Sequence, residues 1–353
     1  MKVLLTSELK GGNPLIDGFY HRMCKFVDIQ ASINEFWSTD SSNHYDVIHL
    51  QWPEQLFKWK KVNRDDILRL EQRLKYWKDN GSRLVITRHN ILPHKLNSLY
   101  QEIYKLIYTY VDAVIHYSYA SIDNFKSMYT NTLDNPSLVH EVIYHPMYSD
   151  ILNDCTQQEA RKTLQLDENK NIILVFGRIR HKKERNLIKS AFKRLDVENK
   201  FLIVPRWYRH PKKKQFFDWV LFQFKRFIYS LKTDRMLGYR LVPEEDIQYY
   251  MNAADVVFIP RSEVLNSGVQ ILAYTFNKVV VGPATGSIGE LLEYSNNPAF
   301  KVDDFEDAAL KLKKGIELSK QKVENYSFAQ KNMNWELVID KHLQLYTKLQ
   351  NEK

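Results

Sequence analysis

Cysteine is scarce in this sequence, which has only Cys24 and Cys155 among 353 residues. Two cysteines cannot build a disulfide framework or, unaided, a zinc site, so we expect a protein of a reducing compartment. Long apolar runs are also missing, because no window approaches the roughly 18 apolar residues of a membrane-spanning helix. The apolar run in the first residues, MKVLLTS, is too short for a signal peptide and predicts a strand instead. We therefore expect a cytoplasmic protein, soluble or peripheral to a membrane.

Two signatures of ligand sites are absent as well. No G-x-G-x-x-G follows the first predicted strand, so the sequence lacks the dinucleotide-binding fingerprint. No Asp-x-Asp pair ends a strand, since Asp303 and Asp304 lie in a late loop. We predict no metal site, no requirement for a divalent metal and no cofactor.

What the chain does contain is the composition of a folded protein. Hydrophobic residues make up 44% of the sequence and charged residues 26%, which argues against disorder. At roughly 100 to 200 residues per domain, the length predicts two domains, each large enough for its own core.

The net charge of +9 is concentrated in one segment, residues 205–235. Nine Lys or Arg and two Asp give this segment a net charge of +7. Within it, residues 215–231 form an aromatic, cationic and amphipathic stretch, QFFDWVLFQFKRFIYSL. Such a stretch suits an anionic membrane interface, and we predict peripheral binding to the inner face of the cell membrane. Packing on the core and a nucleic-acid patch are the alternatives, and we expect no nucleic-acid partner.

Apolar runs bounded by turn residues alternate with helical patterns, which is typical of parallel β-α-β units and predicts an α/β fold. In the first half we predict strands at residues 2–7, 45–50, 83–87, 113–117 and 141–144, and helices at 17–27, 65–80, 98–110 and 121–128. In the second half we predict strands at residues 171–176, 200–205, 256–260 and 279–282, and helices at 186–195, 269–276, 301–314 and 326–349. Thr156 and Glu159 fit the capping box of a further helix.

Histidines follow one of these strands. His89, Asn90 and His94 come after the strand at 83–87. Because ligands of parallel sheets bind beyond the carboxyl ends of the strands, we expect these residues at a binding site. The alternative is that a histidine here caps a helix or bonds to backbone. His116 lies inside a predicted strand, and we expect it to be a satisfied core residue.

A second candidate site lies in residues 253–292. There a predicted helix begins directly after Ser267 and Gly268, which leaves unpaired backbone amides and the positive end of a helix dipole at one point. This arrangement suits a phosphate. Arg178 and Lys183 follow the strand at 171–176 and would suit a diphosphate, although a solvated basic loop is the alternative.

Taken together, these segments resemble the glycosyltransferases of the GT-B fold, of the type that assembles bacterial cell-surface polysaccharide. Each segment carries little weight alone, but their order and spacing cover nearly the whole chain. The segments are GGNP (11–14), DVIHLQWPE (46–54), ITRHNILPH (86–94), VDAVIHYS (111–118), LVFGRIRHKK (174–183), ADVVFIP (254–260), NSG (266–268), NKVVVGP (277–283) and GSIGEL (286–291).

The resemblance implies two Rossmann-like domains that face each other across a cleft. We expect an acceptor-side domain at residues 1–150 and a nucleotide-sugar-binding domain at residues 151–330. Residues 331–353 are expected to form a C-terminal helix that returns to the first domain.

The resemblance also assigns residues to a site. On the donor side it places Arg178, Lys183, Ser267 and Gly268 on the diphosphate, with Glu263 and Glu290 also contacting the donor. His89 and Asn90 become the catalytic residues, and the acceptor side holds Gly11, Gly12, Trp52, Glu54 and His94. One feature departs from the family pattern, in which two glutamates stand eight positions apart, because Glu263 is followed at that distance by Ile271.

The implied activity is that of a metal-independent hexosyltransferase. It would move a sugar from a nucleotide-diphosphate donor to a saccharide acceptor, expected to be lipid-linked, in the synthesis of a surface polysaccharide such as a capsule. If the reaction inverts the anomeric configuration, a general base must accept the proton of the acceptor hydroxyl, and we assign this role to His89, with Glu54 or Asp17 as alternatives. Two other functions stay open, a GT-B sugar-nucleotide epimerase and a non-catalytic protein of the membrane surface.

Overall fold

The computed structural model describes residues 1–9, 13–38, 44–92, 97–130, 132–208, 223, 233–261 and 264–352. The chain divides into two units. The first unit comprises Met1–Pro146, Val264–Asn266 and Asn332–Lys353, and the second comprises Met147–Glu263 and Ser267–Lys331. Each unit is built on a six-stranded sheet in which all paired strands are parallel, so the predicted α/β class is confirmed.

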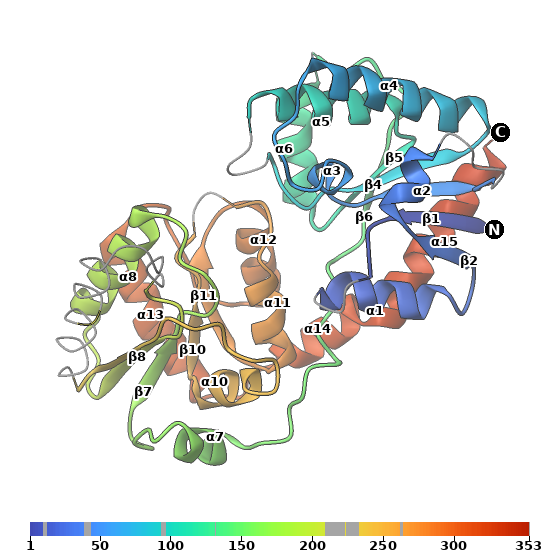
Figure 1. Cartoon of the computed structure of the whole chain (residues 1–353). Coiled ribbons are helices and arrows are strands. Elements are labelled where there is room, and N and C mark those ends of the chain that lie inside the picture. The colour runs from blue at the N-terminus through green and yellow to red at the C-terminus, as the bar shows by residue number, and fades with distance from the viewer. Residues whose placement is uncertain are drawn as a thin grey trace. The chain divides into compact units, whose positions relative to one another are not determined.

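The first sheet has the strand order β2-β1-β3-β4-β5-β6 (Figure 1). Its strands are β1 (Lys2–Thr6), β2 (Asp28–Ala31), β3 (Val47–Leu50), β4 (Arg83–Thr87), β5 (Ala113–His116) and β6 (Val139–Val142). The helices of this unit are α1 (Pro14–Met23), α2 (Ile33–Trp37), α3 (Pro53–Leu56), α4 (Arg64–Asp79), α5 (Leu99–Tyr110), α6 (Tyr119–Tyr129) and α15 (Trp335–Asn351).

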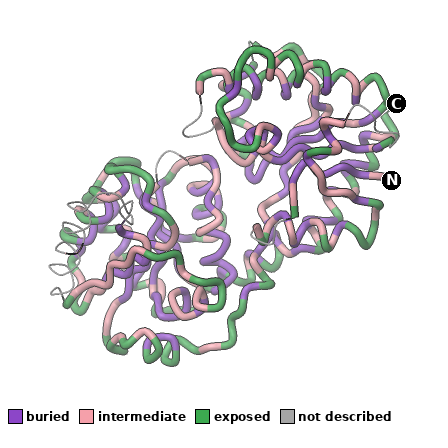
Figure 2. Tube along the Cα trace, in the orientation of Figure 1, coloured by how far each residue is buried: buried purple, intermediate pink, exposed green. Residues whose placement is uncertain are grey.

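Side chains alternate across the first sheet and create two apolar layers. Leu4, Ile48 and Val114 pack with α4, α5 and α6, while the residues next to them in each strand pack with α1 and α15. Because a buried parallel strand is apolar on both faces, these strands are continuous apolar runs in the sequence. Figure 2 shows the buried strands in purple. The contacts of α15 with this sheet confirm the expected return of the C-terminal helix to the first domain.

The second sheet has the order β12-β11-β10-β7-β8-β9. Its strands are β7 (Asn171–Leu174), β8 (Lys200–Val204), β9 (Arg235–Leu237), β10 (Val256–Phe258), β11 (Val279–Pro283) and β12 (Ala299–Phe300). The helices are α7 (Gln157–Thr163), α8 (Lys182–Arg194), α10 (Ile247–Ala253), α11 (Gly268–Thr275), α12 (Gly286–Tyr294), α13 (Phe305–Ser319) and α14 (Asn325–Met333). In Figure 1, α8 and α13 lie together on one side of this sheet, and their apolar faces complete its core.

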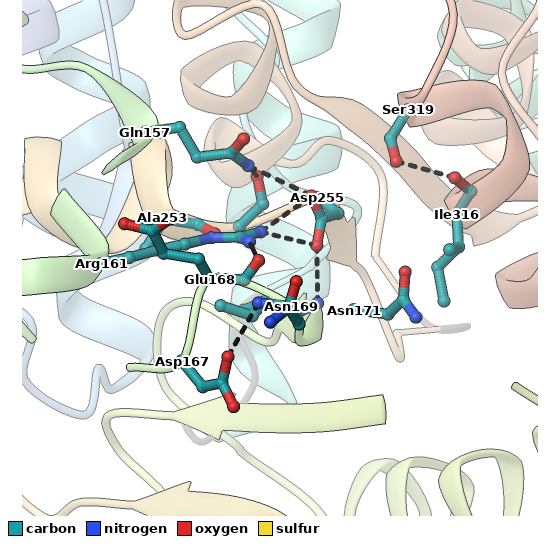
Figure 3. Close-up of polar contacts among 12 residues, drawn as sticks. Gln157, Arg161, Asp167, Glu168, Asn169, Asn171, Ala253, Asp255, Ile316 and Ser319 are labelled. Carbon is teal, nitrogen blue, oxygen red and sulfur yellow. Dashed lines mark hydrogen bonds and ion pairs between the residues drawn. The ribbon is translucent and has the colours of Figure 1, made fainter. Parts of the chain in front are cut away.

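A partly buried ion pair attaches α7 to the second sheet. Arg161 donates through Nη2 to both carboxylate oxygens of Asp255, at 3.0 and 2.9 Å (Figure 3). Asp255 Oδ2 also accepts from the backbone amide of Ile172 at 2.7 Å, so one carboxylate joins α7, β7 and the start of β10. The capping box predicted at the start of α7 is present, with Thr156 and Glu159 as its members.

Several helix boundaries differ from the sequence prediction, among them those of α1, predicted at 17–27, and α13, predicted at 301–314. Two further differences have a clear cause. The helix α8 begins at Lys182 instead of residue 186, because the Glu184 side chain accepts from the amide of Arg180 and supports an earlier first turn. The predicted single helix at 326–349 is two helices, α14 and α15. Asn334 separates them, since its side chain accepts from the amide of Leu337 and caps a new helix.

No helix in the part of the chain that the structure describes combines the length and the apolar character needed to cross a bilayer. The predicted membrane-binding stretch at 215–231 lies outside the described residues except for Gln223.

Candidate functional site

A pocket in the second unit lies at the carboxyl ends of β7 and β10. Gly177 and Arg178 line it from the loop after β7, Arg261 from the loop after β10, and Ser267 and Val269 from the start of α11. Parallel strands bring these loops to the same edge of the sheet, which is where ligands of open α/β sheets bind. The pocket therefore unites two of the residues that the sequence assigned to a diphosphate, Arg178 and Ser267.

Two glycines shape the backbone around this pocket. Gly177 has a φ of 84°, a left-handed conformation that residues with a Cβ rarely adopt. Gly268 is the first residue of α11, and a Cβ there would come within 2.8 Å of the Tyr148 hydroxyl oxygen. The sequence thus uses glycine where the chain must turn and where a helix begins beside a side chain.

The hydroxyl of Ser267 has no hydrogen-bond partner in the part of the chain that the structure describes. Ser267 is the N-cap residue of α11, yet its side chain makes no capping hydrogen bond. The residue is only 6% exposed, and within the described residues its Oγ has no hydrogen-bond partner. Because a buried polar atom is usually hydrogen-bonded, an unpaired hydroxyl beside the N-terminus of a helix indicates a position where a ligand would bond.

Two arginines, Arg178 and Arg261, line the same pocket. Arg261 donates through Nη2 to the carbonyl oxygen of Arg178 at 2.8 Å. Burial lowers the pKa of Arg261, as does the nearby charge of Arg180, while Glu184 opposes the shift. Burial and the charge of Arg178 likewise lower the pKa of Arg206, which follows β8. Burial is the larger cause in both arginines and the neighbouring cation the smaller one, and a bound anion would offset both effects.

Lys183, Gly268 and Glu290 lie in the second unit but do not line the pocket. Lys183 is an exposed residue in the first turn of α8, and Glu290 is a partly buried residue of α12. Glu263 lies outside the described residues.

In the first unit, His89 lies at the carboxyl ends of the strands. Its ring stacks on the indole of Trp52, with centroids 3.7 Å apart and an interplanar angle of 15°. Its Nε2 is 2.8 Å from Oε1 of Gln51, and its Nδ1 is 3.4 Å from the Tyr117 hydroxyl. Asn266, which belongs to the same unit, donates to the His89 carbonyl oxygen at 3.1 Å. Burial, and secondarily the charge of His145, hold the pKa of His89 well below 6.5, so the imidazole is neutral.

Other residues predicted for the acceptor side have different environments. Glu54 is fully buried, and its Oε1 accepts from the Tyr104 hydroxyl at 3.0 Å. Burial raises the pKa of this carboxyl. Asp17 lies in the first turn of α1, and Asn90 is a partly buried residue next to His89. Gly11, Gly12 and His94 lie outside the described residues.

His116 is a satisfied core residue, as predicted. It is fully buried, with Nδ1 2.8 Å from the Ser121 hydroxyl and Nε2 3.0 Å from Nδ1 of His140. Within the described ranges, no three His, Cys, Asp or Glu side chains are grouped closely enough to hold a metal ion.

No protein-family model matches this sequence, and no curated protein sequence is significantly similar to it. Solved structures do match. The complex of Anabaena Alr3699/HepE with UDP-glucose aligns with a TM-score of 0.66 and 16% identity, over 99% of this chain and 100% of that one. Sucrose-phosphate synthase from Thermosynechococcus elongatus aligns with a TM-score of 0.66 and 15% identity, over 96% of this chain and 80% of that one.

A glycosyltransferase from Rickettsia africae aligns over 98% of this chain and 97% of its own, with a TM-score of 0.64 and 13% identity. The chain has the GT-B fold. At these identities the similarity extends to the GT-B architecture of two Rossmann-like domains, and the chemistry must be argued from the residues of this chain.

One arginine that lines the pocket of this GT-B chain, Arg261, was not assigned to it from the sequence. Arg261 follows β10 as Arg178 follows β7, so the same position at a strand end could have identified it. Arg206 follows β8 and does not line the pocket, and the sequence analysis counted it with the basic segment at 205–235.

Proposed function

We propose that this protein is a glycosyltransferase that transfers a sugar from a nucleoside-diphosphate donor to a saccharide acceptor. The observation that carries the proposal is the buried Ser267 hydroxyl, which has no partner among the described residues and lies at the start of α11 in a pocket lined by Arg178 and Arg261. A hydroxyl, free backbone amides and guanidinium groups are donors that suit the oxygens of a diphosphate.

Several of the matched structures support a uridine nucleotide as the donor, although one match, starch synthase IV from Arabidopsis thaliana, is bound to ADP. Alr3699/HepE was solved with UDP, with UDP and glucose, and with UDP-glucose, and another match is described as a UDP-forming trehalose-phosphate synthase. We propose a UDP-hexose as the donor of this protein as well. The acceptor we propose is a lipid-linked saccharide of a surface polysaccharide, which the protein would reach at the inner face of the cell membrane.

Transfer breaks the bond between the anomeric carbon and the diphosphate, so negative charge develops on the departing phosphates. Fixed guanidinium groups and the N-terminus of α11 would stabilise this charge. Lys183 would add a mobile cation from α8, and Glu290 would contact the nucleotide. We assign His89 to accept the proton of the acceptor hydroxyl, with Asn90 beside it. No step requires a divalent metal, so transfer in EDTA should equal transfer without it.

Nucleotide binding can be tested by thermal shift. A ligand that binds only the folded state stabilises it by about 2.7 kcal/mol at a hundredfold excess over Kd. We expect UDP to raise the melting temperature more than GDP, ADP or TDP does, because UDP is the proposed product of the donor. Ser267→Ala should weaken UDP binding by about 10- to 100-fold, the value of a hydrogen bond to a charged group.

The matched control for this binding test is Ser319→Ala, because Ser319 Oγ already donates to the carbonyl oxygen of Ile316 at 2.8 Å on α13 (Figure 3). This variant should bind UDP as the wild type does. Equal UDP affinity in Ser267→Ala and Ser319→Ala would remove Ser267 from the diphosphate site.

We also propose that residues 205–235 attach the protein to an anionic membrane surface. The support is the net charge of +7 of this segment together with its aromatic residues. The protein should float with vesicles that contain phosphatidylglycerol and stay behind with phosphatidylcholine alone. Changing Lys212, Lys213 and Lys214 to Glu should abolish flotation, and a triple variant that floats as the wild type does would refute this attachment.

A further inference from the structure

Gln51 lies between two histidines of the first unit and has no role in the reaction described so far. It directly follows β3 and is 4% exposed. Its amide nitrogen is 3.1 Å from Nε2 of His49, and its amide oxygen is 2.8 Å from Nε2 of His89. A buried amide that joins two imidazoles restricts where both carry their protons.

The donors and acceptors of this chain determine the tautomers. The amide NH₂ of Gln51 can only donate, so Nε2 of His49 must accept. The amide oxygen can only accept, so Nε2 of His89 must carry a hydrogen. Because a neutral imidazole has one N–H, the lone pair of His89 is then on Nδ1, the atom that lies 3.4 Å from the Tyr117 hydroxyl.

The chain of contacts ends on the C-terminal helix. With Nε2 accepting, His49 carries its hydrogen on Nδ1, which is 2.7 Å from the hydroxyl oxygen of Tyr346 on α15. The Thr87 hydroxyl, 2.8 Å from the same Nε2 of His49, also belongs to this chain of hydrogen bonds. His49, Thr87 and Tyr346 are each at most 4% exposed, so water does not compete for these bonds.

We propose that Gln51 is a positioning residue that holds His89 in the Nε2–H tautomer and keeps its lone pair on Nδ1, where the acceptor hydroxyl would replace the Tyr117 hydroxyl as the donor. This proposal rests on the proposed function of His89, but the tautomer itself is a property of the unliganded protein. The stacked Trp52 ring fixes the plane of the imidazole, and Gln51 fixes which nitrogen is basic. Together they preorganise the proton acceptor.

The groups around His89 set its response to pH. Those that can titrate or carry charge are His49 beyond Gln51, Tyr117, His145 and the adjacent Arg88. Burial also holds the pKa of His49 well below 6.5 and raises the pKa of Tyr346. No carboxylate contacts the His89 ring among the described residues, so no negative charge opposes the lowering of its pKa by burial.

The tautomer can be measured by NMR on protein labelled with ¹⁵N-histidine. The nitrogens of His89, identified by loss of its signals in His89→Gln, should show an unprotonated Nδ1 and a protonated Nε2 in the wild type. Gln51→Met, which keeps the length of the side chain but removes both hydrogen bonds, should release this preference. The control is Gln55→Met, because Oε1 of Gln55 has no partner within the described part of the chain.

Kinetics give an independent test that a purely structural role would not affect. Gln51→Met should lower kcat about 10- to 100-fold with little change in KM for the donor, because the proton acceptor is misaligned. Gln51→Glu places a carboxylate on the Nε2–H, which favours the imidazolium. The acid limb of the pH profile should then move to higher pH by about one to three pH units. Gln55→Met should change neither.

Several outcomes would overturn the proposal. A proton on Nδ1 of His89 in the wild type would do so, as would a Gln51→Met protein whose His89 signals and kcat match the wild type. If Gln51→Met does not fold, the wild-type tautomer and the pH profile of Gln51→Glu still test the proposal. If no donor supports transfer by the wild type, the proposed function is wrong. The NMR measurement still tests the tautomer of His89 in that case, because it needs no substrate.

Discussion

Replacing Asp255 with alanine should lower the free energy of unfolding of the second unit by about 3–5 kcal/mol. The change leaves Arg161, whose side chain is 8% exposed, without its carboxylate partner. It also removes the acceptor for the backbone amide of Ile172 at 2.7 Å and for Nε2 of Gln157 at 3.1 Å. A buried cation that loses its partner keeps its desolvation cost, which is why breaking such a pair costs more than the pair itself contributes.

Denaturant unfolding followed by circular dichroism measures this loss for Asp255→Ala. The matched control is Asp196→Ala, which removes an ion pair with Lys313 in which the aspartate side chain is 94% exposed. An exposed pair contributes little, so the control should unfold as the wild type does. Equal midpoints for the two variants would show that the contact between Arg161 and Asp255 does not hold α7 on the sheet.

Replacing His89 with alanine should lower kcat about 100-fold, the lower end of what a positioned general base contributes. The low end applies because burial holds the pKa of His89 well below 6.5, so the neutral imidazole is a weak base. The KM for the donor should change little, since the residues proposed to bind the diphosphate are in the second unit.

Initial rates of sugar transfer from the donor found by thermal shift, in EDTA, measure the effect of His89→Ala. The control variant is His44→Ala, whose histidine is 59% exposed and 3.7 Å from a carboxylate oxygen of Asp46. It should transfer sugar at the wild-type rate. Turnover by His89→Ala within twofold of the wild type would remove His89 as the proton acceptor.

The sequence predicted the central strands better than the edges of the sheets. Strands such as β4 and β10 are buried on both faces and therefore appear as apolar runs with clear ends. The edge strands β2 and β9 were not predicted, because their sequences, DIQA and RML, are only partly buried. An edge strand needs apolar side chains on fewer positions, so its pattern is weaker.

The candidate site was predictable where it depends on position at a strand end or a helix start. Arg178 and Ser267 follow from that rule. Gln51 does not, because an amide carries no charge and its partners are set by folding. His89 is 38 residues away in the sequence, and the contact between His49 and Tyr346 joins residues 297 apart. Only the three-dimensional structure brings such a set together.

The return of α15 to the first sheet has a consequence for the order in which the chain folds. Trp335 packs so closely on α1 that a Cβ at Gly18 would lie 2.7 Å from its ring, and Arg22 stacks on the same indole. One apolar layer of the first unit is thus incomplete until residues 335–351 have left the ribosome. The first unit is translated first but should consequently complete its fold last. During synthesis it would expose an apolar face to which chaperones can bind.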